Sequence, residues 1–293
     1  MEIPHKSGFV NIIGKPNVGK STLMNAFIGE TLSITNPKAQ TTRHRILGIL
    51  NNDNYQLVFS DTPGIIKPAY AMQESMMGFV KEALEDADIV LLMVEAGKDV
   101  EFEERFIAQI NASEVPVLLV INKIDQSNQK ELESDFVRWG KVFPDAEIWS
   151  LSALKQFNIR ELRDRLISLL PEAPAYYPKD TLTDRSERFF CEEIIREKIL
   201  RYYDKEIPYS VQAIVEDFKE EEDIIRIRCT IYVERDSQKN ILIGKGGEAI
   251  KRVGKASRLD MEKFFNKKIF LETFVKVSKN WRKDDLKLKR FGY

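Results

Sequence analysis

The sequence has few cysteines, no long apolar run and almost no net charge. Its two cysteines, Cys191 and Cys229, lack metal-ligand spacing, so we expect both to be reduced core residues in a cytoplasmic protein. The longest apolar runs, residues 89–94 and 115–121, are far shorter than a membrane span and suit buried parallel strands instead. Lys and Arg total 45 against 46 Asp and Glu, so any surface for a polyanion must be local.

The chain is long enough for two domains, with 293 residues. Strand-like and helix-like segments alternate over residues 1–170, which predicts an α/β domain with a mostly parallel sheet. Three prolines within eight residues predict a linker over residues 171–184. Residues 185–293 have the pattern helix, strand, strand, helix, loop, helix, strand, which predicts a second, α+β domain. We expect strands at residues 9–13, 46–50, 56–60, 89–94, 117–121, 147–151, 211–216, 224–234 and 269–277, and helices at residues 21–27, 73–85, 102–112, 130–139, 159–169, 185–203 and 248–265.

A phosphate-binding motif follows the first expected strand. Residues 14–21 match G-x-x-x-x-G-K-[ST] between a strand and a helix, which is the context of a P-loop. The glycines let backbone amides approach phosphate oxygens, and the following helix adds its positive dipole end. Lys20 would reach the β- and γ-phosphates, and Ser21 would coordinate Mg²⁺. The predicted nucleotide-binding residues of this loop are Gly14, Asn17, Val18, Gly19, Lys20, Ser21 and Thr22.

Two segments further along the chain complete a predicted magnesium and γ-phosphate site. Asp61 ends an expected strand and begins a D-x-x-G motif, in which it would hold the Mg²⁺ shell while the Gly64 amide meets the γ-phosphate. Residues 40–44 lie between the two motifs and supply a switch hydroxyl, for which Thr42 is the first choice and Thr41 the alternative. The predicted catalytic residues are Lys20, Thr42 and Gly64, and the predicted metal ligands are Ser21, Thr42 and Asp61.

Base specificity is predicted from residues 122–125, Asn-Lys-Ile-Asp, at the end of an apolar strand. The Asp125 carboxylate can accept hydrogen bonds from guanine N1–H and from the exocyclic amine, a pair of donors that adenine lacks. Lys123 would pack over the base, and Asn122 would tie the loop together. Ser152 and Ala153, after the next strand, would offer backbone amides to guanine O6. A P-loop kinase or ATPase is therefore disfavoured.

These motifs resemble the translation-factor-related class of P-loop GTPases, and the segments PNVGKS and QTTRHRI resemble the Era family of bacterial ribosome-assembly GTPases. The resemblance implies hydrolysis of GTP to GDP and phosphate with Mg²⁺ as the cofactor. The position where many GTPases carry a water-orienting glutamine holds Ile65, which Era-like proteins share, so we expect slow intrinsic hydrolysis. In related GTPases an asparagine at the position of Asn17 helps to bind a monovalent cation, which makes K⁺ a further expected cofactor.

The second half of the chain resembles a type II KH domain. Residues 244–247, Gly-Lys-Gly-Gly, match the G-x-x-G loop that clamps a nucleic-acid backbone in such domains. We expect Ile241, Leu242, Ile243 and Ile250 to line a base-facing groove. The basic residues Lys251, Arg252, Lys255 and Arg258 are predicted to share one side of the next helix. The predicted RNA-binding residues are Ile243, Gly244, Lys245, Gly246, Gly247, Lys251 and Arg252.

The Era resemblance implies a monomer that binds single-stranded 16S rRNA near its 3′ end and acts in assembly of the 30S ribosomal subunit. GTP would order the loops near Thr42 and Gly64 and so control RNA binding. The basic stretch at residues 276–290 also leaves open a C-terminal domain that binds a protein or an anionic membrane, with peripheral association at the inner face of the cell membrane. Trp281 and Phe291 are interpreted either as stacking groups or as packing groups.

Overall fold

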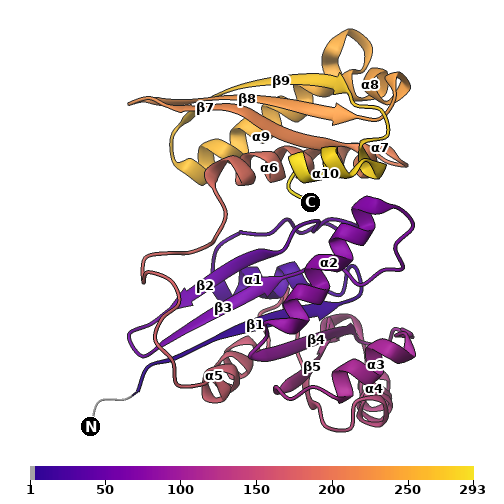
Figure 1. Ribbon diagram of the computed structural model, residues 1–293, viewed down its shortest axis with the longest axis vertical. Coiled ribbons are helices and arrows are strands. Elements are labelled where there is room, and N and C mark those ends of the chain that lie inside the picture. The colour runs from indigo at the N-terminus through magenta and orange to yellow at the C-terminus, as the bar shows by residue number, and fades with distance from the viewer. Residues whose placement is uncertain (1–3) are drawn as a thin grey trace. The chain divides into compact units, whose positions relative to one another are not determined.

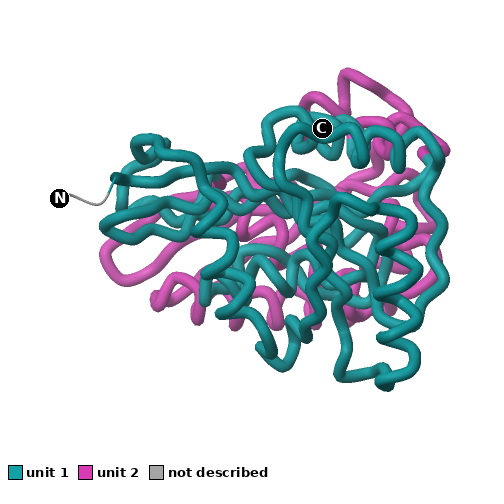
Figure 2. Tube along the Cα trace, turned by 90° about the horizontal axis from the view of Figure 1, so that it is seen from below, with its two compact units in different colours: residues 1–67, 76–184 teal, residues 68–75, 185–293 magenta. Residues whose placement is uncertain are grey.

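The computed structural model describes residues 4–293, which form two compact units (Figure 2). One unit comprises the described residues up to 67 together with residues 76–184. The other comprises residues 68–75 and 185–293. Within residues 4–293, no helix is both long enough and apolar enough to cross a membrane.

The first unit is built on a six-stranded sheet in the order β2-β3-β1-β4-β5-β6. All neighbouring strands are parallel except β2 and β3, which form a hairpin. This confirms the predicted mostly parallel sheet. The strands are β1 (Lys6–Gly14), β2 (Ile46–Asn51), β3 (Tyr55–Asp61), β4 (Ile89–Glu95), β5 (Val117–Asn122) and β6 (Glu147–Ser150).

Helices pack against this sheet and bury its apolar strands. Helix α1 contacts β1, β2 and β3, whereas α3 and α4 lie beside β4 and β5 (Figure 1). Trp139 of α4 and Phe143, which directly follows this helix, join the β4 and β5 side chains in one buried cluster. The strand ends that carry the predicted motifs are therefore held on a rigid core. The helices are α1 (Lys20–Ile28), α2 (Ala71–Glu85), α3 (Glu104–Asn111), α4 (Gln129–Val142) and α5 (Ile159–Leu169).

Some strands begin or end a few residues away from the predicted positions, because strand pairing continues into polar residues. Strand β1 begins at Lys6, before the predicted start, because Lys6 already pairs with Tyr55 of β3. The segment predicted as a linker runs beside the edge strand β2, where Ile49 N donates to the Leu182 carbonyl at 2.8 Å, and the Gln56 side chain of β3 hydrogen-bonds the backbone of Tyr176 and Tyr177. Its backbone groups therefore have fixed partners in the first unit.

The second unit is an α+β domain with a three-stranded sheet in the order β7-β8-β9. Strand β8 is antiparallel to β7 and parallel to β9. Helices α6 and α9 contact each other, with α6 against β7 and α9 against β9. Cys191 and Cys229 are buried in this core as free thiols. The elements are α6 (Glu187–Tyr202), α7 (Ile207–Ser210), β7 (Gln212–Glu220), β8 (Ile224–Val233), α8 (Asp236–Ile243), α9 (Glu248–Phe265), β9 (Lys268–Val277) and α10 (Asp285–Arg290).

The C-terminal segment is folded against the second unit. Trp281 is fully buried and donates from Nε1 to the Ser210 carbonyl at 3.1 Å. The Phe291 ring packs edge-on against Trp281, with ring centroids 5.4 Å apart. Both aromatic residues are therefore packing groups, and of the two interpretations of the sequence the packing one is correct.

Candidate functional site

The loop between β1 and α1 has the backbone shape that its glycines predict. Gly19 has a φ of 101°, and a Cβ at this position would collide with the Asn122 side-chain amide. A Cβ on Gly14 would collide with the Met93 carbonyl of β4. Asn17 adopts a φ of 65°, which asparagine tolerates better than most residues. The loop therefore curves tightly enough to surround a phosphate with backbone amides.

Lys20 lies inside this loop. Its Nζ donates to the carbonyl oxygens of Gly14 at 3.1 Å and Lys15 at 3.0 Å. Burial lowers the pKa of Lys20 to about 8, although the nearby Asp61 carboxylate opposes the shift. A phosphate brought to this loop would stabilise the charged ammonium, as nucleotide binding requires.

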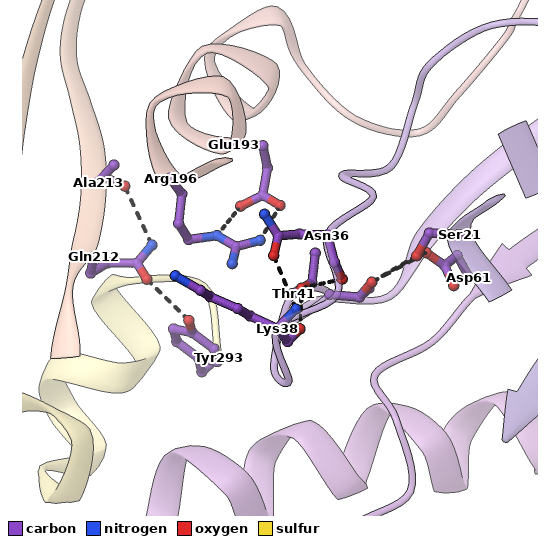
Figure 3. Close-up of polar contacts among 11 residues, drawn as sticks. Ser21, Asn36, Lys38, Thr41, Asp61, Glu193, Arg196, Gln212, Ala213 and Tyr293 are labelled. Atoms are coloured by element: carbon purple, nitrogen blue, oxygen red, sulfur yellow. Dashed lines mark hydrogen bonds and ion pairs between the residues drawn. The ribbon is translucent and has the colours of Figure 1, made fainter. Parts of the chain in front are cut away.

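The three predicted magnesium ligands converge on one point, reached from α1, β3 and the loop before β2. Ser21 Oγ donates to Asp61 Oδ2 at 2.6 Å (Figure 3) and lies 2.9 Å from Thr42 Oγ1. Burial raises the pKa of the Asp61 carboxyl, while Lys20 and the hydroxyls of Ser21, Ser33 and Thr42 oppose the rise. Asp61 Oδ1 is buried and has no hydrogen-bond partner within residues 4–293. Two hydroxyls beside a carboxylate with an unsatisfied buried oxygen fit a Mg²⁺ site, because Mg²⁺ prefers oxygen ligands.

The structure separates the two candidate switch hydroxyls. Thr41 Oγ1 donates to the Lys38 carbonyl at 2.5 Å and the Asn36 carbonyl at 3.3 Å, so it closes a local turn (Figure 3). Thr42 Oγ1 instead faces Ser21 and Asp61. This geometry favours Thr42, the first choice from the sequence, as the metal ligand.

Gly64 lies directly against the phosphate-binding loop. A Cβ on Gly64 would lie 2.6 Å from the Pro16 nitrogen, so only glycine fits there without movement. The next amide, Ile65 N, donates to the Gly14 carbonyl at 3.0 Å. The Ile65 side chain packs against the buried cluster of β4 and β5. An aliphatic side chain in this place cannot orient the attacking water.

The predicted base-recognition residues are bonded to one another. The Asn122 amide donates to the Val18 carbonyl at 2.8 Å and accepts from Ala153 N at 3.0 Å, which ties three loops together. Ser152 Oγ donates to Asp125 Oδ1 at 2.5 Å and so orients the carboxylate. The negative charge and acceptor oxygens of Asp125 suit a base that offers two donors.

A cavity of about 350 Å³ adjoins the phosphate-binding loop. Lys123 and Leu154 both line it, in keeping with apolar contact to the two faces of a purine. The sequence interpretation missed the contribution of residues 34–37, which line the cavity and accept a hydrogen bond from Asn17 Nδ2 at the Pro37 carbonyl. It also missed Glu95, whose carboxylate holds Lys123 Nζ at 2.6 Å. Glu95 could have been found, because it ends β4 beside Asn122 of the neighbouring parallel strand.

The second unit carries a groove of about 320 Å³ between α9 and β9. Lys251, Lys255 and Arg258 line its helical side, and Leu271 and Thr273 line its strand side. The G-x-x-G loop precedes α9, with Gly246 and Gly247 at positive φ and Lys245 exposed. Three of the predicted basic residues therefore line one groove, and the predicted loop lies at the N-terminal end of the same helix.

One prediction about this groove was wrong, since Leu242 does not face it and is fully buried in the domain core. Arg252 is exposed and lies over the Tyr202 ring of α6 at 4.7 Å, and it is not among the residues that line the groove. Its predicted role in RNA binding stays a prediction.

The fold and the site together define a P-loop GTPase that carries a KH domain. Residues 9–123 match the family model described as a 50S ribosome-binding GTPase, and residues 206–282 match the KH domain model.

Relatives that cover the whole chain specify the family. The GTPase Era of Syntrophus aciditrophicus is 48% identical over 294 residues, covering 99% of this chain and 96% of that protein. The GTPase Era of Thermoanaerobacter sp. strain X514 is 43% identical over 292 residues, covering 99% and 97%. This chain belongs to the Era family of GTPases.

Solved Era structures share the architecture. A complex of Era with MgGDPNP and nucleotides 1506–1542 of 16S ribosomal RNA has a TM-score of 0.94 and 37% identity, covering 99% of both chains. An Aquifex aeolicus Era variant bound to GDP and AlF4⁻ has a TM-score of 0.93 and 37% identity, covering 98% of this chain and 99% of that one. The chain is a GTP hydrolase that uses GTP, GDP and Mg²⁺.

Proposed function

We propose that this GTPase binds the single-stranded 3′ end of 16S rRNA in the groove between α9 and β9 and acts in assembly of the 30S subunit. The main support is the groove itself, which Lys251, Lys255 and Arg258 line on the helix that directly follows the G-x-x-G loop. A relative 37% identical over nearly the whole chain was solved with 16S rRNA nucleotides 1506–1542.

The groove has the chemistry that a single RNA strand requires. A Cβ added to Gly246 or Gly247 would meet no atom within 4 Å, so the surface of the loop is open to a sugar-phosphate backbone. The cationic side chains of α9 offer phosphate contacts, while Ile250 and Leu271 offer apolar contact to bases. Thr273, on the strand side, adds a hydroxyl for base edges.

In the hydrolysis step, the residues of this chain bind and orient the nucleotide phosphates. Lys20 and the P-loop amides stabilise charge on the transferred phosphoryl group. Ser21, Thr42 and Asp61 would hold the Mg²⁺ ion, which neutralises phosphate charge when bound. Because the Ile65 side chain has no polar group to orient the attacking water, we expect slow turnover in the isolated protein.

RNA binding can be tested by fluorescence anisotropy with a labelled RNA of nucleotides 1506–1542. Charge reversal at one groove lysine, Lys251→Glu, should weaken binding by about tenfold or more and reduce its salt dependence. Lys263→Glu is the matched control, since Lys263 is exposed on α9 and lies outside the groove. Equal affinity for the two variants would contradict RNA binding in this groove.

The assembly role needs a measurement in cells. We expect RNA crosslinked to the protein to be enriched in 16S 3′ sequences, with enrichment lost in Lys251→Glu. Depletion of the protein should lower the yield of mature 30S subunits. Binding to anionic vesicles rather than to RNA, with no effect on subunit yield, would favour the membrane alternative.

A further inference from the structure

The segment that carries Thr42 is a long connection without regular structure. We call residues 30–45, between α1 and β2, the switch loop. Loops of this length are usually functional, and their ends decide how far the middle can move. Side-chain hydrogen bonds from Asn25 and Arg45 hold the two ends of the switch loop.

Asn25 holds the first end. Its Oδ1 accepts from Leu32 N at 3.0 Å and Ser33 N at 3.1 Å, and its Nδ2 donates to the Ser33 carbonyl at 2.9 Å. Asn25 lies four residues after Ser21 on α1, so both side chains project from one face of the helix. The first end of the loop is thus fixed to the same helix face as a magnesium ligand.

Arg45 holds the second end, three residues after Thr42. Its Nε donates to Ser60 Oγ at 2.7 Å, and its two terminal nitrogens contact the Asp86 carboxylate at 2.6 and 2.9 Å. Ser60 immediately precedes Asp61 on β3, the second magnesium ligand. Asn11 Nδ2 donates to Asp86 Oδ1 at 2.8 Å and so fixes the carboxylate that receives Arg45.

We propose that Asn25 and Arg45 are positioning residues that fix one end of the switch loop to the helix of Ser21 and the other end to the strand of Asp61, which limits the positions that Thr42 can take relative to Mg²⁺. The residues between the anchors can then respond to the γ-phosphate while their end points stay in register with the metal site. Without the anchors, more conformational freedom must be lost each time Thr42 binds the metal.

If Asn25 and Arg45 position the switch loop, their loss should affect GTP hydrolysis and GDP binding differently. A role only in stabilising the fold would not give this difference. GDP binding depends on the P-loop and the base site, whereas Thr42 is needed only when the γ-phosphate and Mg²⁺ are engaged. Loss of an anchor should therefore lower kcat and raise the Mg²⁺ concentration for half-maximal hydrolysis, with little change in GDP affinity.

The experiment measures GTP turnover against Mg²⁺ concentration for Asn25→Ala and Arg45→Ala. Each should lower kcat by about tenfold and raise the Mg²⁺ requirement several-fold, while the Kd for GDP changes by less than about threefold. Arg165→Ala is the matched control, since it removes an exposed Arg165–Glu147 pair from α5 and β6. Unchanged Mg²⁺ dependence in both anchor variants would overturn the proposal.

A second set of variants covers the case in which the alanine variants fail to fold. Asn25→Asp keeps the acceptor for two amides but loses the donor, and Arg45→Lys keeps the charge but loses the bond geometry. Both should show intermediate Mg²⁺ requirements. In a Thr42→Ala background, Arg45→Lys should have no further effect on kcat, because it acts through Thr42. Additive losses in that background would show that Arg45 acts by another route.

Discussion

The replacement Asp125→Asn tests the recognition of guanine directly. The carboxylate accepts two donors on the base, and each hydrogen bond to a charged group contributes about 1.5–3 kcal/mol. Asparagine can still accept one of these donors, so the replacement would weaken GTP binding by at least the loss of one such bond, about 1.5–3 kcal/mol or roughly 10–10²-fold. Asparagine presents one acceptor and one donor, which matches xanthine, whose C2 carries a carbonyl in place of the amine. Ser152, which orients the wild-type carboxylate, can equally orient the amide.

Competition against a fluorescent nucleotide would measure these affinities with GTP, XTP and ATP. We expect the variant to bind XTP more tightly than GTP, and we expect neither the wild type nor the variant to bind ATP appreciably. Asp145→Asn is the matched control, because Asp145 is an exposed carboxylate in the turn before β6. If the variant retained the wild-type order of nucleotides, the assignment of base recognition to Asp125 would be refuted.

Other parts of the structure make stability and salt dependence testable. Burial raises the pKa of Glu192, which accepts from Val215 N at 2.7 Å, to about 7. In the unfolded chain this carboxyl loses its proton near pH 4.5. As pH rises from about 4.5 to 7, the wild type should therefore lose stability relative to Glu192→Gln, by up to about 1.4 kcal/mol per pH unit. A difference in thermal unfolding that does not change with pH would contradict this. Trp281→Ala should destabilise the protein by about 3–5 kcal/mol in urea unfolding, whereas Leu286→Ala, at an 81% exposed side chain, should change little. K⁺ should accelerate GTP hydrolysis relative to Na⁺, and Asn17→Ala should abolish the difference; equal wild-type rates in the two salts would remove the cation hypothesis.

The nucleotide-binding half could be predicted closely because its signals are local. The P-loop, D-x-x-G and Asn-Lys-Ile-Asp segments each end a parallel strand, and such strands bring their carboxyl ends to one edge. The sequence therefore implied that Ser21, Asp61 and Asp125 share one site without any tertiary information. Glu95 escaped notice because no motif contains it, although its strand register beside Asn122 places it there.

The second half was harder to predict because its groove depends on helix packing. The basic residues of α9 were visible, but the direction of Arg252 is set by the Tyr202 ring on a different helix. Leu242 sits in an apolar run whose periodicity cannot distinguish groove from core, and its burial follows from how α8 meets the sheet. Trp281 is buried because the chain folds back and offers its indole the Ser210 carbonyl. Such contacts join residues distant in sequence, where pattern alone carries little information.

Thr41 and Thr42 of the switch loop show what could not be predicted from the sequence. The two threonines are adjacent in the sequence, and each has a hydroxyl at a suitable sequence spacing from the P-loop. Spacing alone could therefore not exclude Thr41. The choice follows from competition for hydrogen-bond acceptors. Thr41 Oγ1 is satisfied by the Lys38 carbonyl of its own turn, and that turn directs Thr42 toward Asp61. A neighbouring hydroxyl therefore shapes the loop while the next one is presented to the metal, and exchanging their roles would require the turn to open.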